Sequence, residues 1–208
     1  LIPAMGCTEP IALAFAAAKV REVLGDIPER IVLQVSGSII KNVKSVIVPN
    51  TGGMKGIRAA VSAGIIAGDA SKELEVISSV SPGQLEDMIA YMDMTPIDIQ
   101  HVEFGHVFDI IITAKKGNSN ATVRIFDYHT NIVFVQKDLK ILHDTRAHGG
   151  DDEDRSDRSL LSLEGIWDFA NTAELDDVRE LLERQIEYNT AIAKEGISGN
   201  YGANVGKT

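Results

Sequence analysis

The chain has little cysteine, few aromatic residues and no long apolar run. Its 208 residues include one cysteine, so no disulfide can form within the chain, and we expect a reducing compartment, the cytoplasm. No run of about 18 apolar residues occurs, so the sequence predicts no membrane partner. Aromatic residues make up only 5%, which leaves Ala, Val, Ile and Leu to build the core.

Basic charge is scarce as well. The net charge is −10, and no basic stripe is visible, so we expect no nucleic-acid partner. Residues 1–60 nevertheless carry a small excess of basic groups, and a small anionic substrate would prefer that part of the chain. Residues 147–162 are rich in Gly and Asp without apolar periodicity, which is typical of an acidic flexible linker.

Apolar periodicity predicts an α+β fold, in which helices from both ends of the chain pack with an antiparallel β subdomain. Residues 39–48 fit either a short helix followed by a strand or one irregular run. We predict helices over 10–24, 54–67, 83–92, 163–172 and 176–194. We predict strands over 30–35, 98–104, 107–115, 120–127, 131–136 and 139–143.

These elements suggest four successive parts. Residues 1–96 form an N-terminal helical part that carries the motifs GCTEP and NTGGMKG, and residues 97–146 form the antiparallel β unit. The acidic linker over 147–162 follows, and residues 163–208 form helices that lead into a further half absent from this chain.

Cys7, the only thiol, stands directly before a predicted helix start at which Thr8 or Glu9 is the N-cap. The positive end of a helix dipole favours thiolate, so we expect the pKa of Cys7 to be lowered. A thiolate attacks electrophiles or binds soft metals. The alternative is a small buried cysteine at the start of a helix.

Two further motifs could bind a ligand. Gly52 and Gly53 expose backbone N–H groups just before a helix, with Lys55 close by, and such a loop can hold a carboxylate or phosphate. His129 lies in YHTN between two predicted strands, where it can serve as a general base or a substrate clamp. A plain turn is the alternative for each motif. The other four histidines show no ligand-like spacing.

Three segments, PAMGCTEPIALAFAAAK, SGSIIKNVKSVIVPNTGGMKG and YHTNIV, occur in this order. Together they resemble the L-cysteine desulfidase family, which is similar to the iron–sulfur L-serine dehydratases and includes serine dehydratase alpha-like proteins. The resemblance covers nearly the whole chain. Because members of that family are much longer, the chain resembles their N-terminal half.

The resemblance implies a lyase that eliminates the β-substituent of L-cysteine or L-serine. The products are pyruvate, ammonia and either sulfide or water. It also implies a [4Fe–4S] cluster with Cys7 as one ligand and the remaining thiolates in the missing C-terminal half. By this reading the chain alone lacks the cluster and is inactive. The implied partners are a small amino-acid substrate and the missing half of the same protein. The sequence leaves the oligomeric state open, and a homo-oligomer is one alternative.

The resemblance also suggests roles for individual residues. His129 and Lys55 are assigned to catalysis, His129 orienting the substrate or shuttling a proton and Lys55 helping to hold the carboxylate. The expected substrate-binding residues are Ser36, Ser38, Asn42, Thr51, Gly52, Gly53, Thr130 and Asn131.

Three other readings stay open on the sequence. Cys7 and His129 could act as a nucleophile and its base. Pyridoxal phosphate on Lys41 or Lys55 could perform the same elimination. Alternatively, the β unit and its flanking helices form a module that binds small molecules without catalysis.

Overall fold

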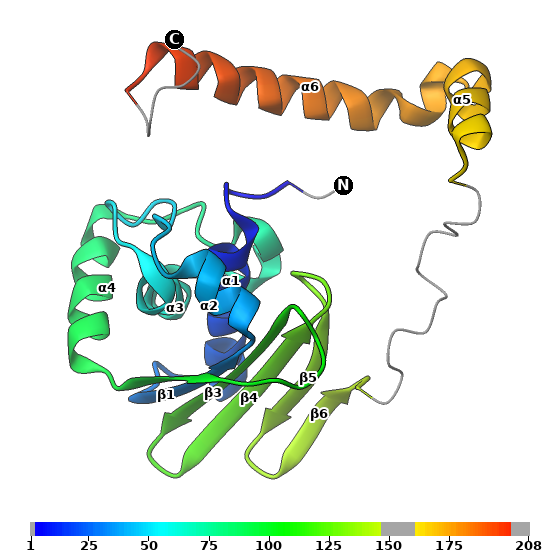
Figure 1. Cartoon of the computed structure of the whole chain (residues 1–208). Helices are drawn as coiled ribbons and strands as arrows, with labels where there is room; N and C mark the ends of the chain where they lie inside the picture. Colours follow the sequence, from blue (N-terminus) through cyan, green and yellow to red (C-terminus); the bar gives the residue numbers. More distant parts are fainter. Residues whose placement is uncertain (1–2, 147–160, 201–208) are drawn as a thin grey trace. The chain divides into compact units, whose positions relative to one another are not determined.

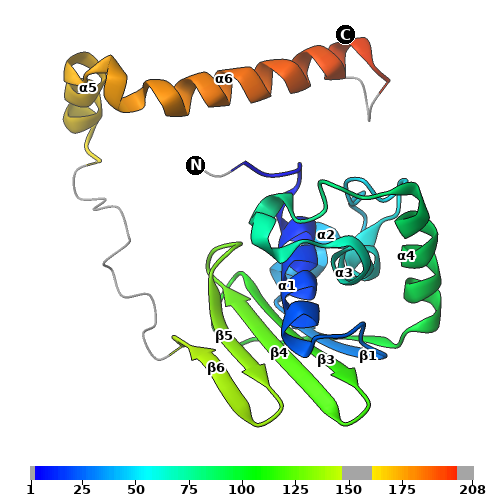
Figure 2. The same cartoon turned by 180° about the vertical axis from the view of Figure 1, so that it is seen from behind.

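The computed structural model describes residues 3–146 and 161–200. These residues fall into two compact units, one ending at Arg146 and the other beginning at Leu161. The first unit combines a β-sheet with helices that cover one of its faces (Figures 1 and 2), which confirms the predicted α+β class. The predicted linker over 147–162 lies outside the described residues, except for its last two positions.

Helix α1 (Thr8–Leu24) is the central element of the first unit. Its Ala-rich sequence is buried on nearly every side, because one side lies against β3 and β4 and another against α3. The helix ends at Gly25, whose φ of 84° permits its N–H to bond the Arg21 carbonyl at 2.8 Å. The predicted helix is confirmed, but its N-cap is Cys7 rather than Thr8 or Glu9, because Cys7 has extended backbone angles.

The remaining helices of this unit follow the sequence closely. Helix α3 (Gly56–Ala67) crosses α1 with Gly64 against the Ala14 backbone, and α4 (Pro82–Met94) packs on α3. A capping box between Ser81 and Gln84 starts α4. The ambiguous segment contains α2 (Gly37–Val43) and a single β-bridge between Ile47 and Lys55. A short 3-10 helix, η1 (Ala70–Glu75), was not predicted.

The sheet has the order β2-β1-β3-β4-β5-β6. Its strands are β1 (Arg30–Val35), β2 (Ile97–His101), β3 (Asp109–Lys116), β4 (Ser119–Phe126), β5 (Ile132–Lys137) and β6 (Lys140–Asp144). The predicted strands are confirmed, but the sheet is not purely antiparallel, because β1 pairs in parallel with β2. Strand β1 also joins β3, so the sheet includes a strand of the predicted N-terminal part.

Alternate residues of the central strands form the core with α1. Ile31 and Leu33 of β1 and Ile110 and Ile112 of β3 are fully buried on this face. Aliphatic side chains therefore fill the core, as the low aromatic content predicts. The opposite face of the sheet is mixed in character and includes the Thr113–Thr122 hydrogen bond of 2.9 Å.

The second unit contains α5 (Leu163–Thr172) and α6 (Leu175–Ser198), where helices were predicted. No residue of either helix is buried within this unit. These helices form a compact unit of their own, and their predicted packing with the N-terminal part stays a prediction. Across residues 3–146 and 161–200, no helix is both long enough and apolar enough to cross a membrane.

Candidate functional site

Two predicted motifs meet at the carboxylate of Glu9, in the first turn of α1. Its Oε2 accepts hydrogen bonds from Cys7 Sγ at 3.2 Å and from Thr8 Oγ1 at 3.4 Å. Its Oε1 accepts a bond from Asn42 Nδ2 of α2 at 3.1 Å. The GCTEP and SGSIIKN motifs, far apart in the sequence, therefore form one polar cluster.

The loop between β4 and β5 carries His129. His129 makes the smallest of the contributions that lower the pKa of Glu9. The His129 ring packs against Phe108 with a centroid distance of 4.6 Å. Its Nε2 is buried and has no hydrogen-bond partner within the described part of the chain. A buried nitrogen without a partner is unusual, and it can accept or donate a proton when a ligand arrives.

Glu9 is ionised near neutral pH. Partial burial alone would raise its pKa, but hydrogen bonds from Cys7, its own backbone and Asn42, together with the charge of His129, outweigh burial. The net result is a lowered pKa. A carboxylate with a lowered pKa is a weak base, so Glu9 is better suited to orienting neighbours or binding a cation than to abstracting a proton.

The pKa of Cys7 is raised, so the predicted lowering is wrong. Partial shielding from water raises it first, and the hydrogen bond to Glu9 and the negative charge of that carboxylate raise it further. These effects favour the protonated thiol. The alternative of a buried cysteine is wrong too, because Cys7 is exposed.

The loop that carries His129 is held by several contacts. Asp127 has a φ of 65°, and its Oδ1 lies 2.8 Å from His106 Nδ1. The ring of His106 stacks on Phe126 with centroids 3.9 Å apart. Asn131 Nδ2 donates to the Phe126 carbonyl at 3.0 Å. One amide hydrogen of this predicted substrate-binding residue is therefore used in a hydrogen bond within the loop.

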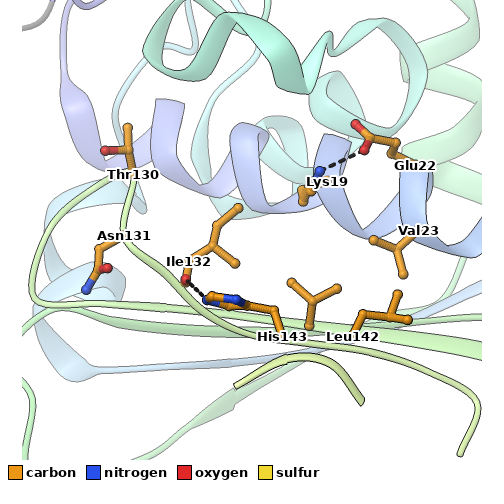
Figure 3. Close-up of a pocket in the computed structure, with 9 residues that line it drawn as sticks. Lys19, Glu22, Val23, Thr130, Asn131, Ile132, Leu142 and His143 are labelled. Atoms are coloured by element: carbon orange, nitrogen blue, oxygen red, sulfur yellow. Dashed lines mark hydrogen bonds and ion pairs between the residues drawn. The ribbon is translucent and has the colours of Figure 1, made fainter. Parts of the chain in front are cut away.

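Thr130 and Asn131 also line a groove of about 730 Å³ (Figure 3). Lys19 and Val23 of α1 and Leu142 of β6 line the same groove. Figure 3 shows the Lys19–Glu22 ion pair of 2.7 Å at its α1 side. It also shows His143 Nε2 3.1 Å from the Ile132 carbonyl oxygen. The groove extends from the loop of His129 along α1, and its lining is partly apolar.

Several residues predicted to bind substrate are instead buried or hydrogen-bonded to the protein's own backbone. Ser36 is buried, and its hydroxyl donates to the Val107 carbonyl at 2.7 Å. Thr51 is buried and donates to the Val48 carbonyl at 2.7 Å. Ser38 is half-buried within α2. Gly52 and Gly53 adopt φ values of 68° and 93° in an exposed turn, as the sequence suggests.

Lys55 lies outside the cluster around Glu9. It lines a cleft together with Lys44 and Arg58, and none of its described contacts joins it to Glu9 or His129. Conversely, the sequence reading missed Glu9 as a site residue and treated it as a possible N-cap. The available signal was an acidic residue two positions after the only thiol, inside a helix's first turn.

An iron–sulfur cluster could take at most one thiolate from this chain. Such a cluster needs three or four protein ligands, mostly thiolates, and the sequence has a single cysteine. Among the described residues, no group of three or more His, Cys, Asp or Glu side chains could hold a metal ion. Cys7 is exposed and can therefore serve as one ligand of a cluster completed from outside this chain.

No family model matches the chain. A UPF0597 protein of Desulfitobacterium hafniense is 50% identical over 207 residues, which are 100% of this chain and 48% of that protein. UPF0597 proteins of Finegoldia magna and Lachnoclostridium phytofermentans are 45% and 44% identical, again over the whole chain and 50% of each relative. Over its full length the chain is thus a homologue of the UPF0597 proteins, and it spans about half the length of the curated relatives that it matches.

Proposed function

We propose that the chain is part of an iron–sulfur-dependent carbon–sulfur or carbon–oxygen lyase that acts on L-cysteine or L-serine. The supporting observation is that two segments with the desulfidase-like pattern join Cys7, Glu9 and Asn42 in one hydrogen-bonded cluster. The third segment supplies His129, which contributes to the lowered pKa of Glu9. The unpartnered Nε2 of His129 adds support, because an elimination needs a base with a free acceptor.

The proposed reaction is a β-elimination. His129 Nε2 takes the α-proton, and the electron pair of the Cα–H bond forms a Cα–Cβ double bond. The Cβ–S bond of cysteine, or the Cβ–O bond of serine, breaks, and the leaving group takes the proton from His129 and departs as hydrogen sulfide or water. The resulting 2-aminoacrylate becomes the imine, and one water molecule hydrolyses it to pyruvate and ammonia.

The other residues of the cluster position the substrate. The ionised Glu9 attracts the substrate ammonium through its negative charge, which stays on the carboxylate near neutral pH. Asn42 fixes the carboxylate against α2. Phe108 packs against the His129 ring and restricts its orientation.

Cys7 is the ligand that this chain would give to a cluster. When bound, the cluster would supply an iron with an open position, which assists departure of the β-substituent as a Lewis acid. Cys7 must lose its proton to bind, so the raised pKa of the thiol makes ligation more favourable at higher pH. Because the other thiolates must come from outside this chain, we expect the chain alone to be inactive.

The test uses a full-length UPF0597 protein with these residues, reconstituted with iron and sulfide without oxygen. Cys7→Ser should abolish the visible absorbance of the cluster and the release of pyruvate. His129→Gln should retain the absorbance and lose most of the turnover. His143→Gln, in the groove beyond the cluster, is the matched control and should stay active. A bound cluster without pyruvate from either amino acid would overturn the lyase and favour a binding module.

The nucleophilic alternative has less support. The hydrogen-bond partner of Cys7 is Glu9 rather than His129, and the pKa of the thiol is raised. A catalytic nucleophile needs a lowered pKa or a hydrogen-bonded base. The Glu9 carboxylate keeps the Cys7 thiol protonated, which disfavours attack by Cys7 on an electrophile. It does not prevent a metal ion from replacing the thiol proton.

A further inference from the structure

A second cleft, of about 490 Å³, lies between α3, α4 and β2. Three basic residues line it, namely Lys44, Lys55 and Arg58. The only acidic residue in its lining is Asp93. This concentration of positive charge contrasts with the net charge of −10 of the whole chain.

Backbone contacts hold the two lysines of the cleft together. Lys44 follows α2 and Lys55 precedes α3, and the antiparallel bridge between Ile47 and Lys55 closes the hairpin between them. The Gly56 N–H donates to the Val46 carbonyl at 3.1 Å. Gly56 has a φ of 87°, and a Cβ there would lie 3.1 Å from the Lys44 carbonyl oxygen. The close approach of the two lysines thus depends on a glycine at 56.

The third cation has a fixed position. Arg58 Nη1 donates to the Ile97 carbonyl at 3.0 Å and Nη2 donates to the Met92 carbonyl at 2.9 Å. These acceptors are neutral, so the guanidinium keeps its full positive charge at the wall of the cleft. The backbone carbonyls also prevent the side chain from swinging away, because both ends of its fork are engaged.

The lysine charges are not compensated within the described part of the chain. Neither Lys44 nor Lys55 has an ion pair or a side-chain hydrogen bond there. Asp93 lines the same cleft but pairs with neither lysine. Two uncompensated lysines that line the same cleft make its electrostatic potential positive, which attracts an anion.

We propose that this cleft is a binding site for a small organic anion with a carboxylate or phosphate group. The anionic group lies between Lys44 and Lys55, and the positive charge of Arg58 attracts it further. Apolar side chains complete the lining and accept the carbon part of the ligand, namely Ile57, Met92 and Ile99. The site is separate from the Glu9 cluster, to which none of these residues belongs. Lys55, which the resemblance assigns to the substrate carboxylate of the lyase, lines this cleft instead.

The experiment is done on the 208-residue chain without a cluster, at low ionic strength, by isothermal titration. One arm uses inorganic phosphate and the other uses propionate, a short carboxylate with an apolar end that is neither substrate nor product of the proposed lyase. We expect saturable binding of at least one probe and a loss of affinity of about tenfold or more in the double variant Lys44→Gln/Lys55→Gln. Binding in only one arm identifies the anionic group.

The matched control is Lys72→Gln/Lys116→Gln, which changes the net charge equally at exposed lysines elsewhere. It should keep the affinity of the unsubstituted chain within about twofold. The loss of affinity in Lys44→Gln/Lys55→Gln is attributed to lysines that contact the anion, and a change in net charge alone should not reproduce it. Equal weakening in both double variants, or no saturable binding of either probe, would overturn the proposal. The melting temperatures of both double variants are measured as well, to check that each remains folded.

Discussion

The thiol of Cys7 donates a hydrogen bond of 3.2 Å to Glu9 Oε2, and this contact moves the pKa values of the two groups in opposite directions. The pKa of Glu9 is lowered despite partial burial, because the thiol, its own backbone and Asn42 all donate to it. The pKa of Cys7 is raised by shielding from water and then by the carboxylate. At neutral pH the pair is therefore a protonated thiol beside an ionised acid.

Glu9→Gln is expected to lower the pKa of Cys7. The substitution removes the negative charge beside the thiol while keeping the size of the side chain. The pH profile of alkylation by iodoacetamide should shift to lower pH, and the rate at neutral pH should rise severalfold, because the thiolate is the reactive form. The readout is specific because the chain has one cysteine.

Glu22→Gln is the matched control for that measurement. Glu22 lies on the same helix and pairs with Lys19 at 2.7 Å, so its substitution removes one negative charge elsewhere on α1. Alkylation of Cys7 should be unchanged in this variant. An unaltered pH profile in Glu9→Gln would show that the carboxylate does not control the thiol.

Gly64→Ala is expected to destabilise the first unit. A Cβ at position 64 would meet the backbone carbonyl of Ala14, which cannot move without shifting α1. Overpacking of a core typically costs about 1–3 kcal/mol, and a clash with backbone falls at the upper end or beyond. Urea unfolding measures the loss. Gly83→Ala, where nothing lies near the new Cβ, should be neutral or slightly stabilising.

The sequence predicts local structure well wherever composition alone decides it. The Ala-rich run before Gly25 gives α1, and the two-residue period around Lys116 and Ser119 gives the β3–β4 hairpin. It does not predict that β1 lies between β2 and β3, because strand order depends on pairing between distant residues. Alternation in Ile31 and Leu33 shows only that one face of this strand is buried.

The candidate site is predicted in its residue types but not in its geometry. Cys7, Asn42 and His129 are all identified from motifs, yet Glu9 is recognised only from the hydrogen bonds that it accepts from Cys7 and Asn42. The direction of the Cys7 pKa is missed for the same reason. A helix end affects every cysteine at that position, whereas a neighbouring carboxylate is visible only once side chains have been placed.

Asp109→Asn is expected to be strongly destabilising. Asp109 is 1% exposed and makes two hydrogen bonds to Arg124, at 3.0 Å from Nε and 2.7 Å from Nη2. Removing one charge of a buried pair leaves the other uncompensated and typically costs about 3–5 kcal/mol. Urea unfolding of Glu22→Gln, which breaks a more exposed pair, should show a much smaller change. Equal losses in the two variants would contradict the role of burial.

Tyr91 provides a test of stability against pH. Its hydroxyl is buried and donates to the Pro28 carbonyl at 2.9 Å, and burial raises the pKa of Tyr91 to about 12. Because the pKa of tyrosine in an unfolded chain is about 10, the folded state favours the protonated phenol. The contribution of this group to stability is complete below about pH 10 and is lost as the pH rises toward 12.

Tyr91→Phe separates this effect from all other titrations. The variant should lose about 1 kcal/mol or more at pH 8, because the Pro28 carbonyl loses its donor. Phenylalanine does not titrate, so the difference in unfolding free energy between the two proteins should shrink steadily between about pH 10 and pH 11.5. Lysine and arginine titrations cancel in that difference, since both proteins share them. A difference that stays constant over this range would mean that the phenol reaches water in the folded state.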